Sequence, residues 1–289
     1  DVERELCAHM LRNAIAGAKE EGTWTPKKRS SETDPMARAA TTAPLGARLE
    51  SKGGPIRPEE PPPVQKLRFR VARQGELRFL SHLETMRAWI RSLRRARAPL
   101  AYSQGFHPHP RVAFSCALPT GEVSVGDYMD VVLVEREDPA AFLVRLAGVL
   151  PEGLGVLSVE EVPLKAPSLM SVVAGFDYAI TTDEFEVDEM QGRVEVLLAS
   201  PQLTVQRRAK RRGRKTEVEV DIRGAIDSLT VASDQGRAQV QFRSRDQGSG
   251  LAKAREIVAL LGLDPHLTAI EKQDTYLRDK IDAPEGVVA

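Results

Sequence analysis

The hydrophobic pattern of residues 67–163 changes between the period of a strand and the period of a helix in a fixed order, and this order restricts the fold. Leu67, Phe69 and Val71 alternate with arginines, which is typical of a half-buried strand. Helices are predicted over 81–97 and 139–149, and extended segments over 99–103, 111–116, 128–134 and 154–162. The order strand, helix, two strands, helix, strand predicts a ferredoxin-like unit, in which both helices cover one face of an antiparallel sheet.

A looser version of the same pattern follows. Its expected elements are a strand (176–182), a helix (187–200), a hairpin (203–208 with 217–222), a short helix (222–229), a strand (237–242), a helix (251–261) and a final strand (267–276). We therefore predict an α+β protein with two ferredoxin-like (βαββαβ) halves, residues 66–165 and 174–280, joined near residues 166–173.

The first 65 residues do not have the composition of a compact domain. Residues 1–20 are expected to form a short helix, because Leu6, Met10 and Ile15 have helical spacing. Residues 21–65 are rich in Pro, Gly, Ser, Thr and charge, with too few large apolar side chains to offset the entropy of ordering them. We predict a disordered linker there, a tether between the folded halves and a unit upstream. The start at Asp1 leaves open that the chain is a fragment of a fusion.

Charge is balanced overall but not locally. The net charge is zero, yet residues 66–115 carry +9, residues 116–200 carry −12 and residues 201–223 carry +5. Basic blocks attract polyanions and steer them on approach. The acidic block argues against a protein coated in nucleic acid, and it could equally hold the basic block by intramolecular pairing.

Cysteine usage and hydropathy indicate the compartment. Two cysteines far apart, Cys7 and Cys116, fit a reducing cytoplasm without a disulfide framework. They also exclude a cysteine-rich iron–sulfur or structural zinc site within this chain alone. No apolar run approaches the roughly 18 residues that a membrane span requires, and no signal peptide is evident. We expect a cytoplasmic protein without a membrane partner.

The predicted helix at 81–97 combines a clear start with a cationic face. Ser81 and Glu84 have the spacing of a capping box. One side is expected to be buried, and its members are Leu83, Met86, Trp89, Ile90 and Leu93. The other side carries Arg87, Arg91, Arg94 and Arg95. This side is either a solvated face or a phosphate-binding ridge, since guanidinium groups match phosphate oxygens.

Histidines gather near this helix. His82 lies in the first helical turn, as a cap or packing residue or else as a neutral base or phosphate contact. His107 and His109 flank Pro108, which favours a turn. His82 and His107 are weak candidates for catalysis. His107, His109 and Cys116, with His82, are weak candidates for a zinc site, although no metal is expected.

Aromatic and basic side chains elsewhere are further candidates for nucleic-acid binding. Tyr102 and Phe106 could stack on bases or belong to the core, and Arg111 follows them. The hairpin tip at 207–215 is either solvated or bound to phosphate, and its basic residues are Arg207, Arg208, Lys210, Arg211, Arg212, Arg214 and Lys215. No glycine-rich phosphate loop, serine nucleophile elbow or Cys–His signature supports independent catalysis.

Four motifs resemble those of the radical SAM-linked domain family. They are Leu-Arg-Phe-Leu-Ser-His-Leu at 77–83, Ala-Tyr-Ser-Gln-Gly-Phe-His-Pro-His-Pro-Arg at 101–111, Tyr-Met-Asp at 128–130 and Glu-Val-Pro-Leu-Lys-Ala-Pro-Ser-Leu-Met at 161–170. The resemblance implies a bacterial domain without an assigned reaction, fused to or encoded beside a cobalamin-type radical SAM protein. It implies that the iron–sulfur cluster, S-adenosylmethionine and cobalamin belong to that partner, with no cofactor in this chain.

Three functions remain open from the sequence. The first is an accessory module that binds RNA or a ribosomal component and works with the radical SAM protein. The second is a metal-independent endoribonuclease, because a Ser-His-Leu helix start in a doubled ferredoxin-like chain resembles the CRISPR repeat-processing enzymes. The third is a protein–protein adaptor that docks the radical SAM partner through the basic helix.

Overall fold

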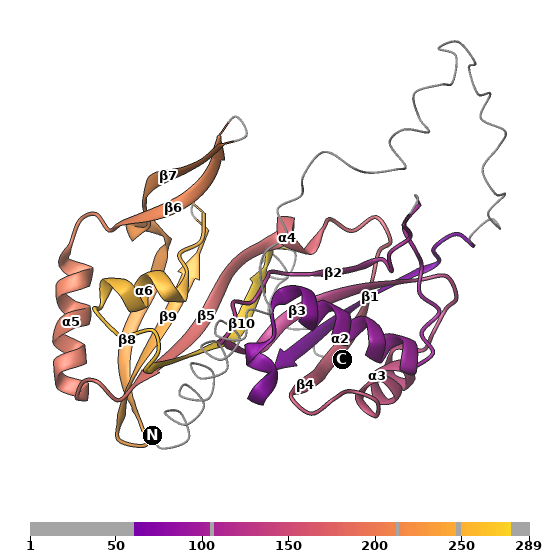
Figure 1. Cartoon of the computed structure of the whole chain (residues 1–289), viewed down its shortest axis with the longest axis horizontal. Helices are drawn as coiled ribbons and strands as arrows, with labels where there is room; N and C mark the ends of the chain where they lie inside the picture. Colours follow the sequence, from indigo (N-terminus) through magenta and orange to yellow (C-terminus); the bar gives the residue numbers. More distant parts are fainter. Residues whose placement is uncertain (1–60, 105–106, 212–213, 247–249, 279–289) are drawn as a thin grey trace, which may run out of the picture. The chain divides into compact units, whose positions relative to one another are not determined.

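A computed structural model of the chain describes residues 61–104, 107–211, 214–246 and 250–278, without the side chains of 209–215. The chain divides into two units, residues 1–58 and 59–289, and all described residues belong to the second. The predicted helix at 1–20 and nearly all of the predicted linker at 21–65 lie outside the described residues. The rest is α+β, as predicted (Figure 1).

The first half contains β1 (Gln65–Arg73), α2 (His82–Arg95), β2 (Val112–Phe114), β3 (Val123–Leu133), α3 (Pro139–Ala147) and β4 (Leu154–Val162), with a 3-10 turn, η2 (Gly75–Phe79), before α2. β1 lies between β4 and β3, and the short β2 pairs with the edge of β3 that faces away from β1. All three pairings are antiparallel. Numbered within the half, the strand order is 4-1-3-2, a ferredoxin-like sheet.

The second half repeats this order with an insertion. It contains β5 (Val173–Thr182), α5 (Val187–Ala199), β8 (Ile226–Asp234), β9 (Arg237–Arg245), α6 (Ala254–Leu260) and β10 (Thr268–Leu277). The sheet order β10–β5–β9–β8 is again 4-1-3-2. A separate two-stranded sheet, β6 (Thr204–Arg211) and β7 (Arg214–Asp221), is inserted after α5 (Figure 1).

The predicted short helix at 222–229 is wrong. A single 3-10 turn, η3 (Arg223–Ala225), is followed at once by β8. Ile226 and Leu229 are both buried although they are three residues apart, because a register shift between Ile226 and Ser228 turns the strand. Two buried residues three positions apart therefore resemble a helix although they come from a β-bulge. The segment is a strand because it pairs with β9.

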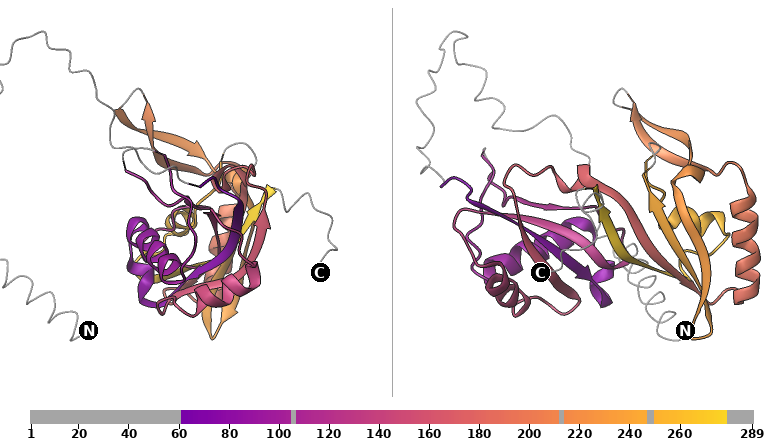
Figure 2. Two further views of the ribbon diagram at one scale, coloured as in Figure 1. Left: turned by 90° about the vertical axis from the view of Figure 1, so that its right-hand side faces the viewer. Right: turned by 180° about the vertical axis from the view of Figure 1, so that it is seen from behind.

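One continuous sheet joins the halves. Helix α4 (Leu169–Val172) connects β4 to β5, and β10 pairs in parallel with β3, matching Lys272 with Ser124 (Figure 2). The backbones approach closely here: a Cβ on Gly126 would overlap the carbonyl oxygen of Gln273 and lie 2.5 Å from Cα of Asp274. Glycine is required at this position by space rather than by φ.

Each half has its own core. In the first half, α2 and α3 pack on the same face of the sheet, since Trp89 and Phe142 are buried in one cluster with Leu67 and Phe69. Phe69 and Phe142 meet edge to face, with ring centroids 5.6 Å apart. The second half buries a separate cluster around Ile180 and Val240. Helix α2 is thus held on the sheet by its middle and second half, through Trp89 and Leu93.

Candidate nucleic-acid interface and the pocket beside it

Helix α2 begins where its sequence predicts. The backbone N–H of Ser81 donates to Oε2 of Glu84 over 2.9 Å, and the N–H of Glu84 donates back to Oγ of Ser81 over 3.4 Å. The Ser81 hydroxyl also donates to Oε2 of Glu84 over 2.7 Å. These bonds, first that of the hydroxyl, lower the pKa of Glu84 below its usual value. The predicted capping box is confirmed.

The buried side of α2 differs from the predicted stripe at its first turn. Trp89 and Leu93 are buried as predicted, but Leu83 is 48% exposed. Ala88 and Ser92 complete the buried side instead, and Oγ of Ser92 donates to the carbonyl of Ala88 over 3.0 Å. Ser92 is small and satisfies its own hydroxyl within the helix, so a polar residue can occupy the packed side.

Arg87, Arg91 and Arg94 form what we call the arginine ridge. All three are exposed, and their spacing of four and three residues places them on one line, spread over about 10 Å of helix axis. Among the described residues none of the three side chains has a salt bridge or a hydrogen bond, and the charge of Arg87 acts on Glu84, one turn before it. The neighbouring Arg95 is exposed too and donates to Oγ of Ser92 over 3.2 Å.

Carboxylates of the acidic block have partners away from the ridge. Among them, Glu122 pairs with Arg255 at 2.7 Å and Asp127 pairs with Lys272 at 2.8 Å. Further pairs are Asp130 with Lys66 and Arg68, Glu137 with Arg145, Glu161 with Arg136, and Asp177 with Arg243. Within the described part of the chain, intramolecular pairing therefore does not neutralise the ridge.

The loop after α2 gathers only some of its candidate residues. Tyr102 is half-buried against the first core and lines a shallow hollow with Arg111. His107 and His109 are exposed, and the backbone N–H of His109 donates to Oγ of Ser103 over 3.0 Å. Phe106 lies outside the described residues.

The weak zinc candidates are not brought together. In the described ranges no group of three or more His, Cys, Asp and Glu side chains could hold a metal ion. Cys116 instead donates to Asp127 and accepts from Lys272. The physical reason is that the thiol of Cys116 is already hydrogen-bonded to the side chains of Lys272 and Asp127.

The inserted hairpin is less available than its sequence suggests. Arg207 pairs with Glu256 of α6, with Nη2 2.7 Å from Oε2, and it donates to the carbonyl of Leu251 over 2.8 Å. Arg207 therefore fixes the hairpin to the second half, and Arg208 is exposed. Lys210, Arg211, Arg214 and Lys215 lie on β6 and β7 without a described side chain, and Arg212 lies outside the described residues.

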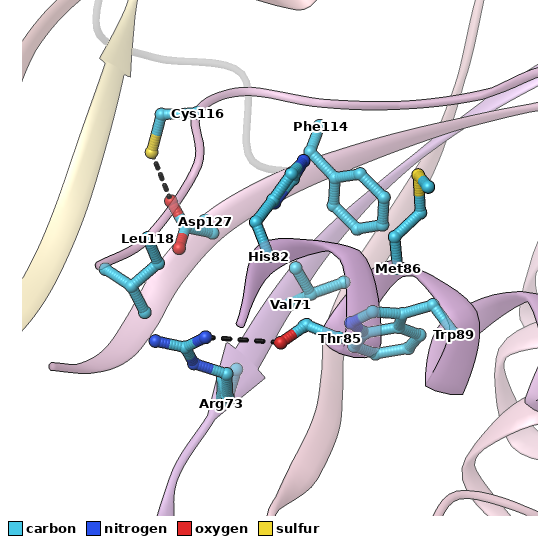
Figure 3. A pocket seen from close by; sticks show the side chains of 11 residues that line it. Val71, Arg73, His82, Thr85, Met86, Trp89, Phe114, Cys116, Leu118 and Asp127 are labelled. Atoms are coloured by element: carbon cyan, nitrogen blue, oxygen red, sulfur yellow. Dashed lines mark hydrogen bonds between the residues drawn. The ribbon is translucent and has the colours of Figure 1, made fainter. Parts of the chain in front are cut away.

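A pocket lies beneath the first turns of α2 (Figure 3). Val71, Met86, Trp89, Phe114 and Leu118 make most of its wall, and Arg73, His82, Thr85, Cys116 and Asp127 add polar groups. The ring of His82 meets that of Phe114 edge to face, with centroids 5.9 Å apart. Within the described residues the His82 ring has this aromatic contact and no hydrogen bond.

Lys272 does not line the pocket but contacts two residues that do, Cys116 and Asp127. Its Nζ donates to Oδ1 of Asp127 over 2.8 Å and to Sγ of Cys116 over 2.7 Å, and it lies 4.5 Å from the ring centroid of Phe176. Burial alone would lower the pKa of Lys272, but Asp127 and the other neighbours raise it, so the ammonium stays charged. Burial, followed by the charge of Asp127, raises the pKa of Cys116 to about 11. The thiol is thus protonated and a poor nucleophile.

Sequence motifs did not identify Arg73 and Lys272 as residues near a pocket, because neither belongs to a recognisable motif. Arg73 donates to the carbonyls of Leu80, Pro119 and Glu122, which ties the turn before α2 to the loop before β3. The available signal for Lys272 was its position in the strand: it alternates in phase with the buried Ile270. A lysine on the inward side of a strand indicates a buried partner.

No helix in the described ranges is long and apolar enough to cross a membrane. Among solved structures, a crystal structure of a Cbf5–Nop10–Gar1 complex is similar at 9% identity, with 72% of this chain and 48% of that chain covered and a TM-score of 0.37. A crystal structure of an unknown protein from Galdieria sulphuraria is similar at 14% identity, with 74% and 99% covered and a TM-score of 0.21. This chain spans about half the length of the first of these chains.

No curated protein matches the chain. A profile of a family described as uncharacterized protein conserved in bacteria (DUF2344) matches residues 66–252. This match spans the arginine ridge, the pocket and the inserted hairpin. Because it covers more than half of the sequence, the chain belongs to this bacterial family, DUF2344.

Proposed function

We propose that this chain is an accessory module that binds RNA or a ribonucleoprotein and works with a radical SAM enzyme. The observation that carries the proposal is the arginine ridge, with three exposed guanidinium groups on one line of α2 and no salt bridge to a carboxylate in the described part of the chain; Glu84, one turn before Arg87, is the one acidic residue within α2. Like charges at these spacings destabilise a helix until an anion neutralises them. Guanidinium groups bind phosphate oxygens in bidentate pairs, and a row of them suits a row of phosphates.

The radical SAM enzyme enters through the motifs at 77–83 and 101–111, which resemble the radical SAM-linked domain family. Under this proposal, the chain presents RNA to the partner, which carries the iron–sulfur cluster, S-adenosylmethionine and cobalamin. The raised pKa of Cys116 supports a binding role for this thiol rather than a nucleophilic one.

The test is RNA binding by the full chain, followed by fluorescence anisotropy over a salt series. Arg87→Gln, Arg91→Gln and Arg94→Gln together should weaken binding. They should also reduce the slope of log K against log salt by about 2, because each phosphate contact on a single strand contributes about 0.7 to the slope. The matched control neutralises Arg136, Arg193 and Arg237, which are partly exposed but paired with carboxylates. Equal losses in both triple variants would assign binding to general charge, and no binding at low salt would reject the proposal.

One observation favours a second candidate, an adaptor that docks the radical SAM partner. Phe79 and Leu83 are 54% and 48% exposed, Phe79 under the guanidinium of Arg78 and Leu83 one helical turn before Arg87, and apolar side chains next to arginines are common in protein interfaces. Partner binding that resists both salt and ribonuclease, and that is lost in Phe79→Ser with Leu83→Ser, would favour the adaptor.

A further inference from the structure

The shallow hollow beside Tyr102 has far more free space than the pocket under α2. It contains about 420 Å³, which lies within the range of about 300–1,000 Å³ for small-molecule sites. The pocket under α2 contains about 30 Å³, which is room for about two water molecules. A flat group the size of a nucleobase therefore fits the hollow and not the pocket.

Both walls of the hollow are tied to the end of β3. The prolines at 61–63 form one wall, and the residue after them donates its backbone N–H to the carbonyl of Leu133 over 2.9 Å. The segment 101–104 forms the other wall, and the N–H of Ala101 donates to the carbonyl of Val132 over 2.9 Å. Neighbouring carbonyls of one strand thus support the two walls, so a ligand loses little affinity to ordering them.

The hollow offers one aromatic ring and unpaired polar side chains. Tyr102 is half-buried, because it packs against the first core while it lines the hollow. Gln104 and Arg111 line the hollow too, and both are exposed without a hydrogen bond or salt bridge of their side chains among the described residues. A fixed ring with free polar groups beside it suits the flat face and polar edge of an unpaired base, and a guanidinium suits its phosphate.

The hollow follows the arginine ridge closely along the chain. Arg94, the last residue of the ridge, precedes Ala101 by seven residues, and seven residues span at most about 25 Å. Consecutive phosphates of a stacked strand advance about 3.4 Å along its axis. About seven nucleotides of one strand therefore cover the distance from the ridge to the hollow.

We infer that the hollow between the prolines at 61–63 and Tyr102 receives one unpaired base of an RNA strand whose phosphates contact Arg111 and the arginine ridge. The inference rests on the proposed function and narrows its substrate class to RNA with an unpaired segment. A base inside a duplex is stacked between its neighbours and cannot lie on the Tyr102 ring. Stacking tolerates every base, so the site selects unpaired RNA rather than a sequence.

The experiment uses a single-stranded RNA of twelve nucleotides, adenosines with 2-aminopurine at every third position. Its binding to the full chain is followed by the anisotropy of a terminal label and by the 2-aminopurine fluorescence. Stacking on Tyr102 should change this fluorescence in step with binding. The same strand annealed to oligouridine is the paired comparison, and its fluorescence should stay constant on binding.

Tyr102→Leu keeps an apolar side chain against the first core and removes the ring. It should weaken binding of the single strand about five- to a hundredfold, the range for one stacked base. The slope of log K against log salt should stay unchanged, because no phosphate contact is lost. Tyr102→Phe should bind like the wild type. Phe185→Leu is the matched control, since it removes a half-buried ring that packs on the core of the second half.

Arg111→Gln is a second variant that leaves the core untouched, because Arg111 is exposed. It should weaken binding and lower the salt slope by about 0.7, the contribution of one phosphate contact on a single strand. The duplex should bind the wild type and Tyr102→Leu equally. Circular dichroism checks that each variant is folded.

The outcomes separate this inference from the proposed function. Wild-type affinity of folded Tyr102→Leu for the single strand, or an equal loss in Phe185→Leu, would overturn the inference and leave RNA binding by the ridge intact. An unchanged 2-aminopurine fluorescence in the wild-type complex would overturn it whatever the variants do. Absence of binding to either RNA at low salt would overturn both.

Discussion

Lys272 connects the two halves, and replacing it tests the account of the fold. The side chain is 1% exposed and lies on β10 of the second half, while its partners Asp127 and Cys116 belong to the first. Lys272→Met keeps an unbranched apolar side chain over Phe176 but removes the charge. Asp127, whose side chain is 13% exposed, then lacks its cation.

The cost follows from this geometry. Removing one partner of a buried pair destabilises a protein by about 3–5 kcal/mol. Because Asp127 is partly exposed, we expect a loss at the lower end of this range, about 3 kcal/mol. For a folded region of this size, that corresponds to a melting temperature about 6–12 °C lower. Replacing both residues, with Asp127→Asn added, should cost about 2 kcal/mol less than the sum of the two single changes, because the uncompensated charge is gone.

Urea unfolding of the full chain, followed by far-UV circular dichroism, measures these values. Arg136→Met is the matched control, since it breaks an exposed pair with Glu161 and should cost less than about 1 kcal/mol. The reasoning is wrong if Lys272→Met costs no more than this control, or if the two changes at Lys272 and Asp127 are additive.

The same pair predicts a pH dependence. The pKa of Lys272 is raised in the folded state, because Asp127 and the other neighbours outweigh the opposing effect of burial. A raised pKa gives stability that is complete below the unfolded value, near 10.5, and is lost as the pH rises above it. The difference between wild type and Lys272→Met should therefore be constant from pH 6 to about pH 9 and shrink at higher pH.

Three further predictions concern single residues. In a Cys7→Ser background, Cys116, with its pKa raised to about 11, should react with iodoacetamide at pH 8 at least tenfold more slowly in the folded chain than in urea. Gly126→Ala should lower the unfolding free energy by about 1–3 kcal/mol or more, measured by urea unfolding, because its methyl group meets the β10 backbone; Gly192→Ala, where nothing lies within 4 Å, is the control. Burial would raise the pKa of Asp177, but the hydrogen bonds from Arg243 and Tyr276 lower it below 3.8. Asp177→Asn should therefore be less stable than the wild type above pH 5, and this difference should shrink as the pH falls below 3.8, measured by unfolding at a series of acid pH values. An alkylation rate equal to that in urea, an unchanged Gly126→Ala, or a pH-independent Asp177→Asn would contradict the respective argument.

Local sequence signals identified the elements whose structure is decided locally. The capping box of Ser81 and Glu84 needs only four residues, and it formed as predicted. The order of strands and helices in the first half followed from periodicity, because each element buries one side, whereas in the second half a helix was predicted in place of the start of β8. Leu83 was misplaced because helical spacing says which residues share a side, but not where the sheet beneath them ends.

Residues decided by distant partners could not be predicted in the same way. Arg207 reads as part of a free basic tip, yet Glu256, 49 residues later, holds it. The pocket combines Arg73 of β1, His82 of α2 and Asp127 of β3, and Asp127 is held by Lys272, 145 residues further along the chain. No local pattern carries such a separation, and only the parallel pairing of β3 with β10 creates it.

This pairing also shows that the physical unit is longer than the family match. The match ends at residue 252, before α6 and β10. Yet β10 lies between β3 and β5 in the middle of the sheet, and it supplies Lys272 to Asp127. Arg255 of α6 adds a second link, since it pairs with Glu122 just before β3. A chain ending at 252 would leave one strand edge open in each half and a carboxylate without its cation beside the pocket. The pocket and the sheet that supports the arginine ridge therefore depend on residues that follow the matched segment, up to Leu277.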